Sequence, residues 1–155
     1  MENILILHNL GSVLNVGAIF RTADAIGIDK IYLTGYSPGL LDKFGRQNKR
    51  ISKSAMGAEN FVKSEQIKDI FNLIKKLKLE GFQIIAVEQD KKSIDYKKIK
   101  LIKKNAFIFG SEVFGIEKKV LKNSDLIAEI PMRGQKNSLN VSTTVGIFLF
   151  KLLDK

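Results

Sequence analysis

One arginine in an amphipathic segment is the first residue that suggests a chemistry. The stretch "NVGAIFRTADAIG" runs from Asn15 to Gly27, and its apolar residues recur at the i, i+3, i+4 and i+7 spacing of a helix face. Arg21 falls on the opposite side, in line with Gly17, and helical side chains lean toward the N-terminus. We expect its guanidinium to reach over backbone left bare at Gly17, toward Asn15, where an anion would bind. A solvated arginine on an exposed face is the alternative.

A second stretch places an acidic residue between glycines. "FGSEVFG", from Phe109 to Gly115, has the G-x-x-x-x-G spacing of a phosphate-binding loop. Ile116 and Glu117 stand where that loop needs Lys-Ser or Lys-Thr, so we exclude a Walker A nucleotide site. The other glycine fingerprint of nucleotide sites, G-x-G-x-x-G, follows none of the expected strands. Glu112 is therefore either a turn residue or part of another kind of site.

The third stretch, "EIPMRGQKNSLNVSTTVG" at 129–146, is the richest in polar groups. Pro131 ends a strand and Gly134 permits a tight turn. Either Ser138 or Asn140 can cap the helix that follows. Capping explains only one of these two polar residues, which flank Leu139 on either side.

Composition excludes several classes of site. The 155 residues suit one domain, and 45% of them are hydrophobic, as in a globular fold. The chain has no cysteine, which excludes disulfides, thiolate catalysis and cysteine metal sites. His8 is the only histidine, ends an apolar run, and is expected to be a strand-end residue rather than a catalyst. We expect no metal.

The N-terminus is not a signal peptide and no run spans a membrane, so we expect a cytoplasmic protein.

The charge balance points to a polyanionic partner. The formal net charge is +10, which favours nucleic acid. An AT-rich genome would also enrich lysine, so the arginines are the more informative cations. There are four of them: Arg21, Arg46, Arg50 and Arg133.

Strands and helices alternate along the chain, which predicts an α/β fold with a largely parallel sheet. We expect strands at 4–7, 30–35, 83–87, 106–110 and 126–130, and helices at 16–26, 67–77, 117–123 and 140–153. A long basic loop is expected at 36–53, and a solvated, lysine-rich face or loop at 91–104. Ligands of such sheets bind beyond the carboxyl ends of the strands, which is where the three stretches gather.

The last expected helix has almost no polar face. Apolar residues occupy nearly every side of this helix, as in a helix that is buried. In a chain of this size an interface between two subunits would bury it, and Thr143, Thr144 and Gly146 would permit close approach. A wholly internal helix is the alternative.

Together the three stretches resemble the motifs of the SpoU/TrmH branch of the SPOUT RNA methyltransferases. "NVGAIFR" is similar to the first family motif, "FIFGSEVFGI" to its G-x-E-x-x-G segment, and "IPMRGQKNSLNVSTTVGI" to its I-P-M-x-G-x-x-x-S-L-N-V-S motif. Order and spacing agree, and the resemblance covers nearly all of the chain. It implies an α/β fold with a C-terminal deep trefoil knot, and a homodimer whose active site lies between subunits.

The resemblance also implies the cofactor and the site residues. S-adenosylmethionine would be the methyl donor, and its pocket would be lined by Gly110, Ile130, Met132 and Leu139, with Val87 and Glu88 at the end of "IIAVEQ". The acceptor would be a ribose 2′-hydroxyl in structured RNA, either tRNA or rRNA.

The resemblance assigns roles to the polar residues as well. Arg21 would lie next to an RNA phosphate, where it would either assist deprotonation, as is proposed in the family, or position the substrate and stabilise charge. We favour the second role, since arginine does not readily lose its proton. Asn15 and Glu112 would pair to brace the loops, while Ser138 and Asn140 would orient ribose or donor. We expect residues 1–155 to form one catalytic domain without a separate RNA-binding domain, so its own basic segments would bind RNA. The competing hypothesis is a non-catalytic RNA-binding module that retains the fold.

Overall fold

Seven parallel strands form a single sheet in the computed structural model, which describes residues 1–154. Their order across the sheet is β3-β2-β1-β6-β4-β7-β5. The strands are β1 (Glu2–His8), β2 (Lys30–Thr34), β3 (Ser64–Ile67), β4 (Gln83–Val87), β5 (Ile94–Asp95), β6 (Lys104–Phe109) and β7 (Leu126–Glu129). The helices are α1 (Val13–Ile26), α2 (Lys49–Ala55), α3 (Ile70–Leu79), α4 (Lys118–Asn123) and α5 (Val141–Leu153), with short 3-10 turns η1 (Ala58–Asn60) and η2 (Tyr96–Lys98).

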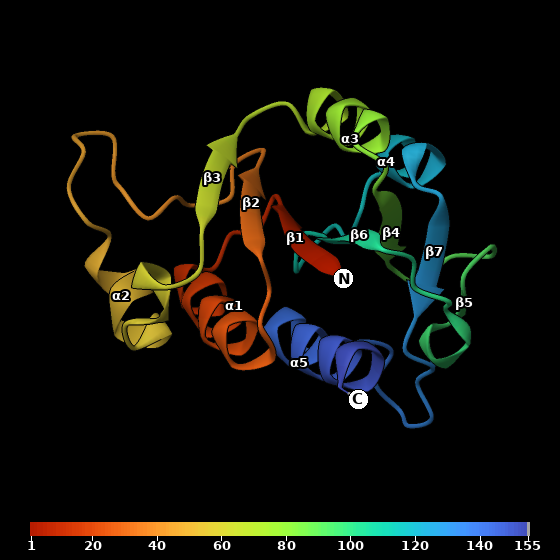
Figure 1. The fold of residues 1–155 in the computed structure, drawn as a ribbon. Helices are drawn as coiled ribbons and strands as arrows, with labels where there is room; N and C mark the ends of the chain where they lie inside the picture. The colour runs from red at the N-terminus through yellow and green to blue at the C-terminus, as the bar shows by residue number, and fades with distance from the viewer. Residues whose placement is uncertain (155) are drawn as a thin grey trace.

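Helices cover both faces of the sheet. Figure 1 shows α3 and α4 on one face and α1, α2 and α5 on the other. Each face has its own apolar cluster, because residues of the central strands alternate between the two sides. Phe148 of α5 meets the rings of Phe107 and Phe109 edge-on, at 5.8 and 5.9 Å. The predicted α/β class with a parallel sheet is confirmed.

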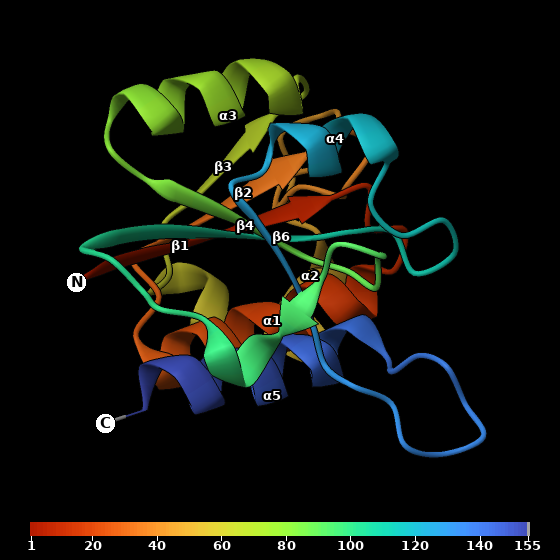
Figure 2. The same cartoon turned by 90° about the vertical axis from the view of Figure 1, so that its right-hand side faces the viewer.

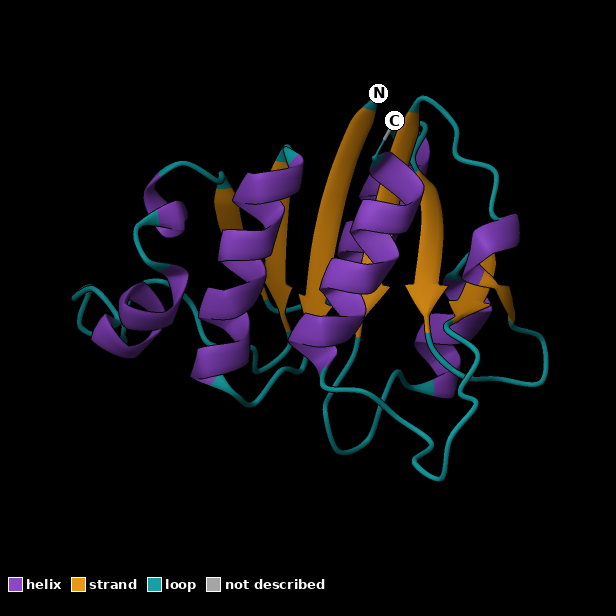
Figure 3. Ribbon diagram, turned by 90° about the horizontal axis from the view of Figure 1, so that it is seen from below, coloured by secondary structure: helices purple, strands orange, loops and turns teal. Residues whose placement is uncertain are grey.

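Strand β7 lies between β4 and β5, which are themselves joined by residues 88–93. Val87 at the end of β4 pairs with Phe109 of β6 on one side and with Ala128 of β7 on the other. The loops that follow these strands therefore leave from one edge of the sheet. Figure 2 shows the loops after β6 and β7 projecting on that side, and Figure 3 shows loops gathered below the strand arrowheads.

Three expected elements differ in the structure. The loop expected at 36–53 ends in α2, which begins at Lys49 after its cap Asn48. Ile67 was expected in a helix but ends the edge strand β3, and α3 begins at Ile70 behind its cap Asp69. The segment 91–104 is more than a solvated loop, because it contains β5 and η2 and buries Tyr96 against Phe148, with ring centroids 5.7 Å apart.

The contact between α1 and α2 corrects one expectation about Arg21. Gly17 is buried rather than bare, and a Cβ atom there would lie 2.6 Å from the carbonyl oxygen of Ile51 and 2.9 Å from the backbone nitrogen of Ala55. Its lack of a side chain lets α2 pack closely against α1. The expectation is wrong because residues 49–55 form a helix, α2, that packs on Gly17, instead of a loop.

Candidate active site

The amino terminus of α1 receives a carboxylate from the turn after β6. Glu112 accepts hydrogen bonds from the backbone nitrogens of Gly11 (3.0 Å) and Ser12 (3.2 Å) and from Nδ2 of Asn15 (3.0 Å). Ser12 caps the helix by accepting from the nitrogen of Asn15. The predicted pairing of Asn15 with Glu112 is present. The anion at this helix end is thus a side chain of the protein itself.

These contacts keep Glu112 charged. Partial burial acts to raise the pKa of Glu112, but the hydrogen bonds from Asn15 and from backbone nitrogens outweigh it, and the pKa lies below its ordinary value. A carboxylate that is ionised and fully engaged is a poor proton acceptor. The geometry therefore gives Glu112 a bracing role rather than that of a general base.

Asn15 links this carboxylate to the last helix. Its Oδ1 accepts from Nδ2 of Asn140, at 3.2 Å. Asn140 caps α5 through its own Oδ1, which accepts from the backbone nitrogens of Ser142 (2.9 Å) and Thr143 (3.4 Å). Of the two expected caps, Asn140 is the one used. Glu112, Asn15 and Asn140 form one network, which we call the polar network.

A tight turn between Gly110 and Ile116 carries Glu112. A Cβ atom on Gly110 would lie 2.7 Å from the backbone of Gly115, so the turn closes only around glycine. Gly115 itself adopts a left-handed backbone with φ +66°. Glu88 supports the turn, because its Oε2 accepts from the nitrogen of Ile116 at 2.9 Å.

The apolar residues expected to line the donor pocket lie at or after the carboxyl ends of β4 and β7. Val87 is buried, Ile130 and Met132 are half-buried, and Leu139 is 41% exposed. The side-chain amide of Gln89 donates to the carbonyl of Asn137, which connects the loop after β4 with the loop after β7. The loop after β4 is therefore bonded to the loop after β7 through Gln89 and to the turn after β6 through Glu88.

Two of the expected site residues stand apart from the polar network. Within residues 1–154, neither Arg21 nor Ser138 joins its hydrogen bonds, and both side chains are exposed. Arg21 projects from α1, and Ser138 lies in the loop before α5. Their predicted roles would need contacts with another molecule.

His8 is a buried structural residue at the end of β1, where the sequence placed it. The backbone nitrogen of Tyr36 donates to Oδ1 of Asn9, which turns the Asn9 amide nitrogen toward Nε2 of His8 and Oε1 of Glu117. Nε2 then accepts, and Nδ1 donates to Thr34 at 2.9 Å. Burial lowers the pKa of His8 although Glu117 opposes the change, so the imidazole is neutral at physiological pH. No sequence pattern indicates this cluster beyond the position of His8 at the end of an apolar run.

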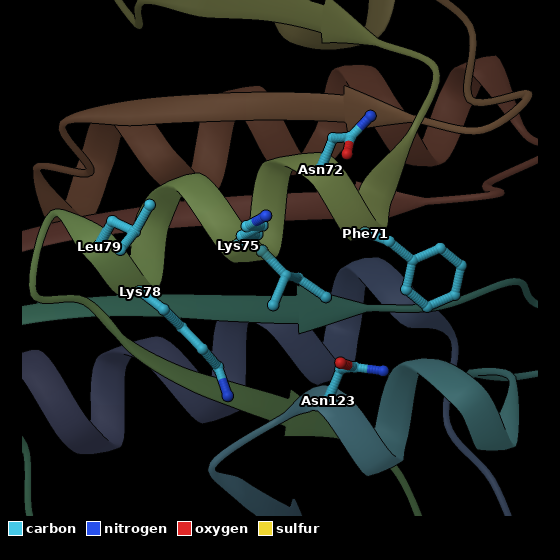
Figure 4. A pocket seen from close by; sticks show the side chains of 7 residues that line it. Phe71, Asn72, Lys75, Lys78, Leu79 and Asn123 are labelled. Carbon is cyan, nitrogen blue, oxygen red and sulfur yellow. The ribbon is translucent and has the colours of Figure 1, made fainter.

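The groove that Figure 4 shows lies elsewhere, between α3 and α4. It has a volume of about 500 Å³ and is on the face of the sheet opposite α1 and α5. Phe71, Lys75 and Lys78 line it, and Lys78 is paired with Asp125 at 2.9 Å. In the described part of the chain, no three His, Asp or Glu side chains form a metal-binding group, and no helix is long and apolar enough to cross a membrane.

Comparison with known sequences gives consistent matches. A model of the SpoU rRNA Methylase family matches residues 2–150. A Borreliella burgdorferi protein named "Uncharacterized tRNA/rRNA methyltransferase" is 36% identical over 150 residues, which are 96% of this chain and 62% of that protein. An Aquifex aeolicus protein named "tRNA (guanosine(18)-2'-O)-methyltransferase" is 29% identical over 96% of this chain and 67% of its own. The chain thus spans about three fifths of the Borreliella relative.

Solved structures match the fold as well. The AdoMet-bound rRNA methyltransferase from Sinorhizobium meliloti superposes with a TM-score of 0.87 at 26% identity, over 97% of this chain and 55% of that one. The A. aeolicus TrmH/SpoU tRNA modifying enzyme gives a TM-score of 0.84 at 27% identity, over 97% of this chain and 73% of that one. The family model covers nearly the whole chain, and the structural likeness has the same extent. The chain belongs to the SpoU rRNA methylase family.

Proposed function

We propose that this protein transfers a methyl group from S-adenosylmethionine to a ribose 2′-hydroxyl of structured RNA, either tRNA or rRNA. Family membership supports methyl transfer to RNA, and the AdoMet-bound Sinorhizobium structure supports the donor. The name of the Aquifex relative supports the 2′-oxygen as acceptor. The observation that carries the proposal is the polar network beside the apolar edge of β4, β6 and β7.

The donor would lie against that apolar edge. Val87, Ile130, Met132 and Leu139 would contact its adenosine, and Gly110 would contribute its backbone, because the space beside its Cα is filled by Gly115 of the same turn. Glu88 would act through the turn that it braces, since its carboxylate already accepts from Ile116. When bound, this donor supplies a methyl group on a positively charged sulfur.

The chemical step is a substitution at the methyl carbon. A lone pair of the 2′-oxygen forms the new C–O bond while the C–S bond breaks, the bonding pair stays on sulfur, and the hydroxyl proton passes to water. Arg21 would hold the neighbouring phosphate and stabilise charge that develops on the oxygen, because a guanidinium keeps its proton. Ser138 and Asn140 would orient the ribose or the donor.

We extend the proposal to the assembly. Ile147 and Phe150 on α5 are 40% and 44% exposed, and Leu14 on the adjacent α1 is 54% exposed, which suits the interface of a homodimer. The insertion of β7 between β4 and β5 fits a chain that continues through a deep trefoil knot. Residues 1–155 would act as one catalytic domain, and the basic residues of 36–53 and 91–104 would contribute to RNA binding.

Two measurements on the wild-type protein test the proposal. Calorimetry should detect binding of S-adenosylmethionine, and transfer of a labelled methyl group to total RNA should yield 2′-O-methylated nucleotides on digestion. Absence of binding at millimolar donor would favour a non-catalytic RNA-binding module. Label on a base instead of a ribose would contradict the assigned acceptor.

A further inference from the structure

The turn that carries Glu112 also presents two apolar side chains to solvent. Val113 is 80% exposed and Phe114 is 83% exposed. Among the large apolar residues of 1–154, none is more exposed than Phe114. Single exposed apolar residues are ordinary, but an adjacent pair at the edge of a candidate site indicates a contact surface.

The backbone of this turn is well fixed. The Ser111 hydroxyl accepts from the nitrogens of Val113 and Phe114, both at 3.2 Å, and the Ser111 carbonyl accepts from Gly115 at 2.9 Å. On either side, Glu112 is bound to the start of α1 and Ile116 to Glu88. The ring of Phe114 is thus presented outward on a rigid support, and a ligand that stacks on it would order little additional chain.

A second aromatic ring stands beside the turn. The hydroxyl of Tyr36 lies 3.5 Å from the Ser111 hydroxyl, and Tyr36 is 60% exposed. Two aromatic side chains therefore flank the segment whose carboxylate belongs to the polar network.

We propose that Phe114, with Tyr36 beside it, stacks on an unpaired nucleobase next to the nucleotide that is methylated. The inference rests on the proposed function, and it deepens it by naming residues that select the substrate. RNA fits these rings, because a chain with a net charge of +10 attracts a polyanion and every base offers a π-face. Phe114 also occupies a free position of the G-x-E-x-x-G motif, so it is available for specificity rather than for closing the turn.

Fluorescence provides a test that does not depend on methyl transfer. The chain has no tryptophan, so Phe114→Trp introduces a single reporter. Addition of total RNA should quench its emission, while inorganic polyphosphate, which has charge but no bases, should not. Phe61→Trp is the matched control, because Phe61 is 78% exposed and lies before the outermost strand β3, away from the carboxyl ends of the strands. Equal quenching of both reporters, or quenching by polyphosphate, would overturn the proposal.

Kinetics complete the test. Phe114→Ala should raise KM for RNA by about 5- to 150-fold, the range expected for loss of one base–aromatic stack, with donor affinity unchanged. Phe114→Trp should retain most activity, because it keeps a stacking surface. Normal methylation by Phe114→Ala would refute the inference and leave the proposed function standing. Loss of the dimer in Phe114→Ala, seen as a monomer mass in light scattering, would also refute the inference, since the ring would then be covered by a second copy of the chain. Quenching without any methylation by the wild type would uphold stacking and refute the proposed function.

Discussion

Glu112 neutralises the amino terminus of α1 from a position 101 residues further along the chain. Its carboxylate accepts two hydrogen bonds from backbone N–H groups there and a third from the side-chain amide of Asn15. The third bond also orients Asn15 toward Asn140. One side chain thus satisfies a helix end and fixes the direction of a neighbouring amide. Loss of its charge should be felt in stability and in site geometry together.

The lowered pKa of Glu112 predicts a pH-dependent contribution to stability. The folded protein binds this proton more weakly than the unfolded chain, so the contribution is complete above the ordinary pKa of 4.5 and is lost as the pH falls through the lower folded-state pKa. Glu112→Gln should reduce the free energy of unfolding by about 0.3–1 kcal/mol near neutral pH and low salt. Urea unfolding should show this difference shrinking toward zero in acid. The exposed Glu80, changed to Gln, controls for loss of one negative charge, and a pH-independent difference at Glu112 would contradict the assignment.

The proposed role of Arg21 depends on a contact with RNA, because its side chain is exposed and does not join the polar network. If it positions the reacting nucleotide, Arg21→Ala should slow single-turnover methyl transfer by about 100-fold or more, at least ~2.7 kcal/mol of transition-state stabilisation. Unfolding free energy should change by less than about 0.5 kcal/mol, since the side chain is exposed. Arg21→Lys should rescue poorly, because it loses the planar fork. The control is Lys76→Ala on α3, on the other face of the sheet. Near-normal transfer by Arg21→Ala would leave the motif as evidence for fold only.

The family resemblance predicted the pairing of Asn15 with Glu112, because both residues belong to motifs that match the family. It did not predict that Glu112 occupies the helix end, since that contact depends on how the turn after β6 meets α1. The Asn15–Asn140 bond was also missed, because residues so far apart are joined only by tertiary packing. Arg21 and Ser138 both lie on the surface, and their roles in the site stay predictions.

At the scale of elements, the close packing of α1 and α2 depends on Gly17. Gly17→Ala should lower the free energy of unfolding by about 1–3 kcal/mol, because the new methyl group meets backbone atoms of Ile51 and Ala55 that cannot rotate away. Adding Ser54→Ala removes a third, side-chain contact and should recover only part of the loss. Thermal unfolding of the two variants measures both values. A gain of about 0.5–1 kcal/mol, the effect of helix propensity alone, would show that α2 can move aside.

Sequence patterns predicted the elements with the strongest periodicity and missed those without it. The central strands are continuous apolar runs because both of their faces are buried. The edge strand β3 is short and polar, so it resembled the start of α3, although Asp69 before Ile70 has the sequence character of a helix cap. Helix α2 buries only Ile51 and Ala55, so it has no clear apolar periodicity. Its two lysines and its arginine make it look like part of the basic loop.

At the scale of the whole molecule, α5 separates into two faces. Val145, Phe148 and Leu149 are buried in the core, while Ile147 and Phe150 remain partly exposed. The helix is therefore not wholly internal, and the expected interface stays a prediction.

The proposed dimer can be tested at that outer face. Light scattering at micromolar concentration should give about twice 17.4 kDa for the wild type and about 17.4 kDa for Ile147→Glu combined with Phe150→Glu, because two charges cannot be buried in an apolar interface. Leu79→Glu, at an 81% exposed position on α3, should keep the wild-type mass. A monomeric wild type would contradict the dimer and the shared active site together.

Under the proposed function, the polar network would also set when the protein becomes able to methylate RNA during its synthesis. Asn15 and Asn140 are 125 residues apart, and a ribosome adding about 5–20 residues per second needs roughly 6–25 s to make that stretch. In this interval the nascent chain completes α1 and its basic segments but lacks the partner at the start of α5. If the protein binds RNA as proposed, a growing chain would meet RNA well before it could hold the reacting groups in place. Under the proposed function, methylation begins only once the last helix has been made and has docked.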